Sequence, residues 1–209
     1  MLRPSGTRTA LLLGVLAPPL FVLVFLVDGL IHPAYNPVTD FVSELSRGEL
    51  GWLQIANFLV FGAALLVFAA GIRWGARRRA GSVAGPVLFS VMGAGLITAG
   101  IFVTDAHTSS VSTLSGTIHI LASLPVFVCL IVACFVFARR FRGTLRTYSI
   151  ASGIAVLILF VATFVIGDSL GITGILQRAT IVVGWAWITV LALALRAKEA
   201  PSEAHPSLV

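Results

Sequence analysis

Charged side chains are scarce in this chain. They make up 11% of its 209 residues, whereas a soluble domain carries roughly 25%. Hydrophobic residues account for 58% of the chain, and its mean hydropathy is +1.03. Such a shortage of charge argues against an ordinary soluble domain and is typical of a chain whose solvent is mostly lipid.

Cysteine is almost absent as well. The only two cysteines, Cys129 and Cys134, lie in one apolar run. Residues five apart on a helix point in different directions, so we expect no disulfide between them. The sequence also lacks a Walker loop, HExxH, GxSxG, CxxC and a dinucleotide-binding fingerprint. None of the common signatures of nucleotide binding, zinc proteolysis, serine hydrolysis or dithiol chemistry is therefore present.

What the chain does have is a series of six long apolar runs. They cover residues 9–31, 51–71, 82–103, 115–138, 148–167 and 175–195. Since a membrane-spanning helix needs about 20 apolar residues, the sequence predicts an all-α polytopic membrane protein. We expect an antiparallel bundle of six transmembrane helices forming one domain over residues 1–199, followed by a disordered cytoplasmic tail at 200–209.

Two of these runs carry residues that predict local geometry. Pro18 and Pro19 interrupt the first run, and we expect a kink there because proline removes a helical hydrogen bond. The third run is rich in glycine, which allows neighbouring helices to approach closely.

The basic residues predict the orientation of the bundle. Twelve of the fourteen Lys and Arg residues fall on the side of both termini, and only Arg47 and Arg178 fall on the other. The positive-inside rule then places both termini in the cytoplasm, with the chain crossing a cell membrane, here a bacterial inner membrane, several times. The basic turns need no nucleic-acid partner, because setting the orientation and contacting anionic lipid headgroups explain them.

The acids show the opposite distribution. Six of the eight fall on or near the predicted outer face, together with three of the four histidines: Asp28, Asp40, Glu44, Glu49, Asp105, Asp168, His32, His107 and His119. Polar groups at membrane depth are costly and are usually functional or paired. The sequence therefore predicts a functional site at the extracytoplasmic end of the bundle.

The polar stretch 32–47 follows the first run. Asp28 and His32 are four residues apart and share a helix face, where the carboxylate could orient the imidazole or simply close the end of the helix. From Asn36 to Arg47 the pattern predicts a short amphipathic outer helix packed against the mouth of the bundle. Its polar face would carry Asp40, Ser43, Glu44 and Arg47, at spacings of i, i+3, i+4 and i+7.

On that predicted helix, Asp40 and Glu44 repel each other unless a positive group lies between them. Arg47, Arg178, a protonated histidine or a bound cation could supply the charge. Arg178 opens the sixth run, and we expect it to pair with Asp40 or Asp105. The alternative is that it binds an anionic headgroup or a carboxylate.

Four short motifs give the chain a family resemblance. They are YNPVTDFVSELS after the first run, GIFVTD at the end of the third, the His of SGTIH opening the fourth, and QR opening the sixth. In these the chain resembles a bacterial family of six-helix membrane proteins of unknown function, numbered 998. The resemblance implies a six-helix bundle without an established activity. It would mark as functional Asp40, Ser43, Glu44, Asp105, His119 and Arg178.

Two functions remain open at this point. The leading one is a protein without enzymatic activity whose polar pocket at the outer face binds a lipid headgroup or small ligand, or passes a proton or solute, with membrane lipids as partners and no cofactor. The alternative is a membrane-embedded, metal-dependent hydrolase, similar in spirit to the alkaline ceramidase and adiponectin-receptor superfamily. Its zinc ligands would be His32, Asp105, His107 and His119. That superfamily has seven spans and a pair of histidines in the last one, whereas the last run here opens with Gln177 and Arg178, so the hydrolase ranks second.

Overall fold

Six long helices form the molecule, as the apolar runs predict. A computed structural model describes residues 4–77 and 83–199, so the predicted disordered tail at 200–209 lies outside the described residues. The long helices are α1 (Pro4–Ile31), α2 (Gly51–Arg77), α3 (Ala84–Ile101), α4 (Leu114–Ala138), α5 (Gly143–Val165) and α7 (Thr173–Glu199). All six are long and apolar enough to cross a membrane, and the chain is a multi-pass membrane protein.

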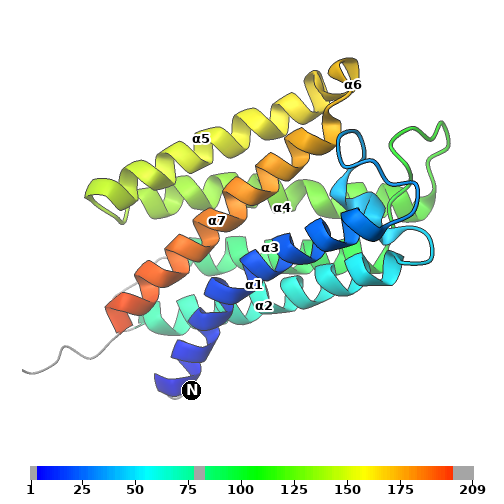
Figure 1. Ribbon diagram of the computed structural model, residues 1–209. Coiled ribbons are helices and arrows are strands. Elements are labelled where there is room, and N and C mark those ends of the chain that lie inside the picture. Colours follow the sequence, from blue (N-terminus) through cyan, green and yellow to red (C-terminus); the bar gives the residue numbers. More distant parts are fainter. Residues whose placement is uncertain (1–3, 78–82, 200–209) are drawn as a thin grey trace, which may run out of the picture.

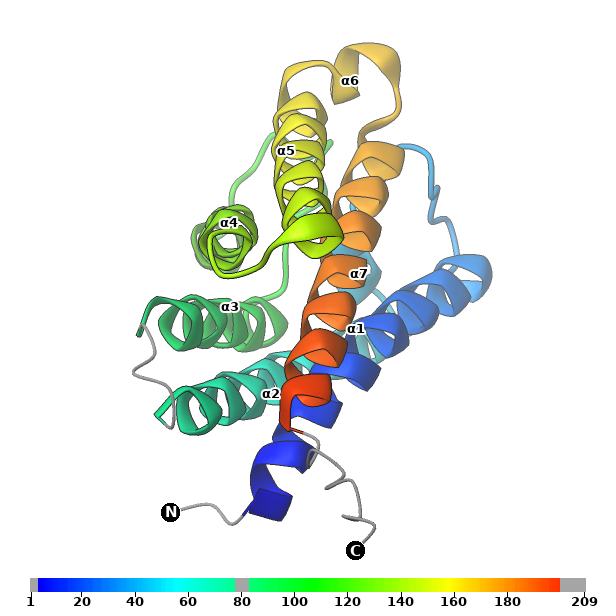
Figure 2. The ribbon, with the colours of Figure 1, turned by 90° about the vertical axis from the view of Figure 1, so that its left-hand side faces the viewer.

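The helices form a closed ring. Each packs against the next in the order α1, α2, α3, α4, α5 and α7, and α7 closes the ring by packing against α1. The start of α1 and the end of α7 lie at the same end of the bundle (Figure 2). We call this the arginine-rich end, because Arg73, Arg77, Arg139, Arg140, Arg142 and Arg146 lie there, and the other end the acidic end. At the acidic end lie Asp28, Asp40, Glu44, Glu49, Asp105 and Asp168.

Glycine allows α3 to approach its neighbours closely, as the third run predicts. Gly62 of α2 and Gly93 of α3 face each other, and a Cβ on either would lie 2.7 Å from the carbonyl oxygen of the other. On the next face of α3, a Cβ at Gly95 would lie 2.7 Å from the carbonyl oxygen of Ala122 in α4. These side-chain-free contacts let α3 pack tightly on both neighbours.

The interior at the arginine-rich half of the bundle is filled by aromatic side chains. Phe89 packs edge-on against Phe68 at 5.0 Å and stacks on Trp187 at 6.4 Å between ring centroids. Trp187 donates its indole N–H to Ser149 of α5 at 3.0 Å, which satisfies the only polar atom of a buried ring. This half of the bundle is a packed core.

Several helix ends differ from the apolar runs. The helix α5 begins at Gly143, five residues before the predicted run, and α2 continues to Arg77, beyond the predicted end at Gly71. Residues with long basic side chains can stay in a helix at the membrane interface and extend their charge to water. The apolar pattern therefore ends before the helix does. The first helix continues through Pro18 and Pro19 and bends along its length (Figure 1).

The prediction of a helix from Asn36 to Arg47 is wrong. Only Val42–Ser46 is helical, as a short 3-10 segment, η1, and residues 36–41 form turns. The side chain of Asn36 accepts a hydrogen bond from the amide of Val38 at 3.0 Å, and such local side-chain bonds compete with helical ones. The segment does pack against the bundle, because η1 contacts α1, α2 and α7 and buries Val42, Glu44, Leu45 and Ser46.

Candidate functional site

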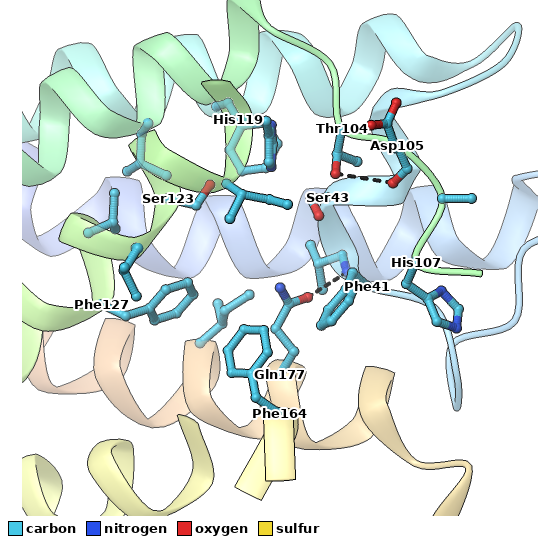
Figure 3. Close-up of a pocket in the computed structure, with 18 of the residues that line it drawn as sticks. Phe41, Ser43, Thr104, Asp105, His107, His119, Ser123, Phe127, Phe164 and Gln177 are labelled. Carbon is cyan, nitrogen blue, oxygen red and sulfur yellow. Dashed lines mark hydrogen bonds between the residues drawn. The ribbon is translucent and has the colours of Figure 1, made fainter. Parts of the chain in front are cut away.

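A pocket of about 440 Å³ opens at the acidic end of the ring. Its volume lies in the range of roughly 300–1,000 Å³ that small-molecule sites occupy. Its polar lining comes from η1, the α3–α4 loop, α4 and the start of α7 (Figure 3). These polar residues are Ser43, Thr104, Asp105, His107, Ser109, Ser112, His119, Ser123 and Gln177.

The deeper part of the pocket is apolar and largely aromatic. Phe21, Phe58 and Trp185 line it and are at most 7% exposed. Phe127 of α4 and Phe160 of α5 complete this part and stack with ring centroids 5.0 Å apart. A polar mouth above an aromatic interior is an environment for a molecule with two chemically different ends.

His119 presents a hydrogen-bond acceptor to this pocket. The ring is 4% exposed, and its Nδ1 lies 2.9 Å from the carbonyl oxygens of Ala99 and of Phe102 at the end of α3. Since carbonyl oxygens only accept, Nδ1 carries the hydrogen and Nε2 keeps a lone pair. Ser123 lies one turn further along the same helix and also lines the pocket (Figure 3).

Glu44 and His107 tie η1 to the α3–α4 loop at the rim. Glu44 is 7% exposed and accepts a hydrogen bond from Nδ1 of His107 at 2.7 Å. It also accepts from the amide of Phe41 at 3.1 Å, and the more exposed Arg47 approaches it at 3.5 Å. The carboxylate that the sequence assigns to an open polar face is therefore buried behind the pocket wall.

Asp105 caps α4. Its two carboxylate oxygens accept from the amide and the hydroxyl of Thr113, both at 2.8 Å, and Thr113 in turn accepts from the amide of Gly116. The bond from the Thr113 amide, followed by that from its hydroxyl, holds the pKa of Asp105 below its usual range. The carboxylate is therefore ionised at neutral pH, and each of its oxygens already accepts one hydrogen bond at the rim of the pocket.

Arg178 binds backbone rather than carboxylate. Its guanidinium donates to the carbonyl oxygens of Pro37 and Asp40 and to the hydroxyl of Tyr35, and it lies 5.2 Å from the centroid of the Tyr35 ring. Among the described residues it forms no ion pair with an acid. The prediction that it pairs with Asp40 or Asp105 is wrong, because turns at 36–41 leave carbonyls that a helix would have used.

We call the hydrogen bonds from Arg178 to the carbonyl oxygens of Pro37 and Asp40 the carbonyl clamp. Neighbouring contacts also hold the 35–42 segment. Tyr35 donates to the carbonyl oxygen of Phe41 at 3.2 Å, and burial raises its pKa to about 12 although Arg178 opposes the shift. The amide of Val42 donates to the side-chain oxygen of Gln177 at 2.7 Å. Gln177 and Arg178, in the second turn of α7, therefore both hold the stretch that carries Ser43 into the pocket.

The structure thus brings together some of the predicted ligand-binding residues. Ser43, Asp105 and His119 line the pocket, and Glu44 contacts it through His107. Asp40 and Arg178 do not line it: Asp40 accepts from the amide of Asn36 and the hydroxyl of Thr39. These two shape the loop beside the site.

The four residues considered as zinc ligands have separate partners. His32 pairs with Asp28 at 3.2 Å, as their spacing predicts, and it does not line the pocket. His107 binds Glu44, His119 binds backbone carbonyls, and Asp105 binds Thr113. Over residues 4–77 and 83–199, no three His, Cys, Asp or Glu side chains form a group that could hold a metal ion, so the geometry does not favour the hydrolase.

Sequence reasoning missed most of the pocket. Ser123 could have been found, since it lies one turn after His119 on one face. Phe127, Phe160 and Trp185 carry no such signal, because an aromatic residue in an apolar run reads the same whether it faces lipid, a helix or a cavity.

Comparison with known proteins gives one match. A family model described as "Protein of unknown function (DUF998)" matches residues 15–194. This range includes parts of all six long helices and every residue that lines the pocket. No curated protein and no solved structure matches the chain.

Proposed function

The chain belongs to the DUF998 family of proteins of unknown function, as its four short motifs predict, and we propose that it binds an amphipathic small molecule inside the membrane. The polar end of the ligand lies among the hydroxyl, amide and imidazole groups at the mouth, and its apolar end reaches the aromatic interior. The observation that carries this proposal is the pocket itself, which passes from Ser43 and Thr104 at the rim to Phe21 and Trp185 inside.

The orientation of the ligand follows from the polar groups of the pocket that can still form hydrogen bonds with it. Nε2 of His119 offers an acceptor, and Ser43 and Ser123 offer hydroxyl groups. The other wall is made of rings, which contribute apolar area and no hydrogen bonds except through the indole of Trp185. An amphipathic molecule satisfies both parts of the pocket. A wholly polar molecule would lose its hydrogen bonds to water on entering the aromatic part and would gain none in return.

We predict that a water-soluble alkyl glycerol ether with bromine at its chain end quenches the fluorescence of Trp185. The bromine would lie beside the indole when the chain occupies the pocket. Quenching should be saturable in wild-type protein in nanodiscs and absent in the variant Trp185→Phe. Quenching that is unsaturable, or the same size without Trp185, would contradict the proposed function.

A variant that fills the pocket provides a second test of the same proposal. Ser123→Phe places a ring in the cavity and should weaken binding of the brominated ether by about tenfold or more. The matched control is Val132→Phe, on the same helix but 42% exposed outside the pocket, which should bind as the wild type does. Thermal unfolding of both variants identifies a loss that comes from misfolding.

We also propose that the acidic end faces away from the cytoplasm of a bacterial cell. Support comes from the twelve basic residues on the side of the termini against two on the other. In a variant without Cys129 and Cys134, a cysteine at the exposed Ser110 should react with an impermeant maleimide added to intact cells. One at Thr144, at the opposite end, should react only after lysis; the reverse pattern would overturn the orientation.

A further inference from the structure

The pocket reaches the lipid-facing surface between α4 and α5. On α4, one stripe of side chains faces α5, and its exposed fraction falls steadily along the helix. It is 59% at Ile120, 49% at Leu124 and 0% at Cys134, with the half-buried Phe127 between the last two. Since these spacings keep all four residues on one face, the gradient shows that α5 lies close at the arginine-rich end and further away towards the acidic end.

The facing side of α5 shows the same gradient. Gly153 lies against Cys134 and Phe135, where a Cβ would come within 2.9 Å of the Cys134 side chain. Phe160 stacks on Phe127 at 5.0 Å, and Phe164, one turn later, is 67% exposed. The two helices diverge in this direction (Figure 1).

Exposed residues of both helices line the cavity. Ile120, Leu124 and Phe164 belong to its lining although each is about half exposed or more. We call the opening that these three border the α4–α5 slot. It leads from the aromatic interior to a surface of apolar side chains within two membrane-spanning helices, so hydrocarbon is the solvent outside it.

The lining also limits the charge of the ligand. Among the described residues that line the pocket there is no Arg or Lys, and its two histidines already bond Glu44 and backbone carbonyls, so no free cation there neutralises a phosphate or a carboxylate. The acid at the rim, Asp105, already has both oxygens bonded to Thr113. What remains are hydroxyl, amide and imidazole groups, which suit an uncharged head group with hydroxyls.

We propose that the ligand is a single-chain lipid with an uncharged, hydroxyl-bearing head group, and that it enters from the bilayer through the α4–α5 slot. This rests on the proposed function and specifies its ligand and its route. The head lies near Ser43, Thr104 and Nε2 of His119, and the chain passes Phe127 and leaves between Leu124 and Phe164. A pocket of about 440 Å³ with one slot between two helices accommodates one chain rather than two.

The test uses a monoacylglycerol that carries a diazirine on its chain, added to the full-length protein in nanodiscs. After irradiation, mass spectrometry should find the label on Ile120, Leu124 and Phe164. Excess unlabelled monoacylglycerol should remove this labelling. A fatty acid or lysophosphatidate with the same chain should remove much less, because each brings an unneutralised negative charge into the pocket.

Variants that narrow the slot, with a matched control, test the route of entry. The double variant Ile120→Phe with Leu124→Phe should reduce competable labelling of Phe164 by about tenfold. The control changes Val128 and Val132 to Phe, a pair with the same spacing on the lipid-facing side of α4, 46% and 42% exposed. It should label as the wild type does.

The outcomes separate the two proposals. Labelling of the slot that excess monoacylglycerol does not reduce, together with saturable quenching of Trp185 by the short ether, would overturn entry through the slot and leave the binding pocket standing. Equal competition by lysophosphatidate would overturn the uncharged head group. If the short ether itself fails to quench Trp185, the proposed function fails and the slot with it.

Discussion

Replacing Arg178 with alanine should lower the free energy of unfolding by about 2–3 kcal/mol, because it releases the 35–41 loop from α7. Each hydrogen bond from a charged donor is worth roughly 1.5–3 kcal/mol, and the stacking on Tyr35 adds about 0.5–1 kcal/mol. One of the two carbonyl contacts, that with Pro37, is exposed, so water recovers part of the loss. Thermal or denaturant unfolding in detergent measures the change.

Two further variants show that the clamp acts on the backbone. Arg178→Lys keeps the charge but not the planar set of donors, and should recover only about half of the stability. Gly174→Ala should destabilise the same loop although Arg178 is still present, because a Cβ there would lie 2.5 Å from the carbonyl oxygen of Asp40 and 2.8 Å from Nη1 of Arg178. Both variants should also speed amide exchange over residues 36–41.

The choice between backbone and carboxylate partners has a direct measurement. If Arg178 paired with the side chain of Asp40, the change Asp40→Asn would recover stability in the Arg178→Ala background. With backbone partners, the two changes should be additive within about 0.5 kcal/mol. A recovery larger than that would contradict the carbonyl clamp.

The membrane spans were predictable because an isolated run of apolar residues is stable in lipid only as a helix, which forms all of its own backbone hydrogen bonds. The close approach of α3 to its neighbours was also predictable, because Gly93 and Gly95 have no side chain to hold the helices apart. The ring order was not predictable, since the apolar faces of the six runs are too similar to say which helix α7 will contact. The four short motifs do not supply that information.

The polar stretch shows where a periodic pattern fails. The spacing of Asp40, Ser43, Glu44 and Arg47 fits an α-helix, yet Asn36 and Asp40 use their side chains to bond nearby amides instead. Once residues 36–41 form turns, their carbonyls need donors, and Arg178 supplies them. The prediction from side-chain charges considered only acidic partners for Arg178, so it missed the backbone carbonyls.

The candidate site was predicted in part. Asp105, Ser43 and His119 line the pocket, since polar residues beside membrane spans gather where water or a ligand can satisfy them. The aromatic interior was not predicted, because the depth of a cavity depends on the divergence of α4 and α5. That divergence follows from the small residue Gly153 at one end and the bulky stack of Phe127 on Phe160 further along.

Replacing Glu44 with alanine should destabilise the acidic end by about 3 kcal/mol, near the lower end of the 3–5 kcal/mol typical of broken buried pairs. The side chain is 7% exposed and accepts hydrogen bonds from His107 and the amide of Phe41. Its loss therefore removes the contact between η1 and the α3–α4 loop and leaves both donors with incomplete partners. Chemical denaturation measures the loss, and amide exchange should rise around residues 104–112.

Partner variants test which contact of Glu44 matters. Arg47 is 46% exposed, and exposed ion pairs contribute at most about 1 kcal/mol, so Arg47→Ala should cost little. His107→Ala should cost more, and its effect should largely disappear when Glu44 is already alanine, because the two changes remove the same contact. A cycle in which Glu44 couples more strongly to Arg47 than to His107 would contradict the buried tie. Glu44→Gln keeps an oxygen in the place of Oε1, which accepts from both the Phe41 amide and Nδ1 of His107. It should therefore recover most of the stability that Glu44→Ala loses and slow amide exchange again in both η1 and the α3–α4 loop.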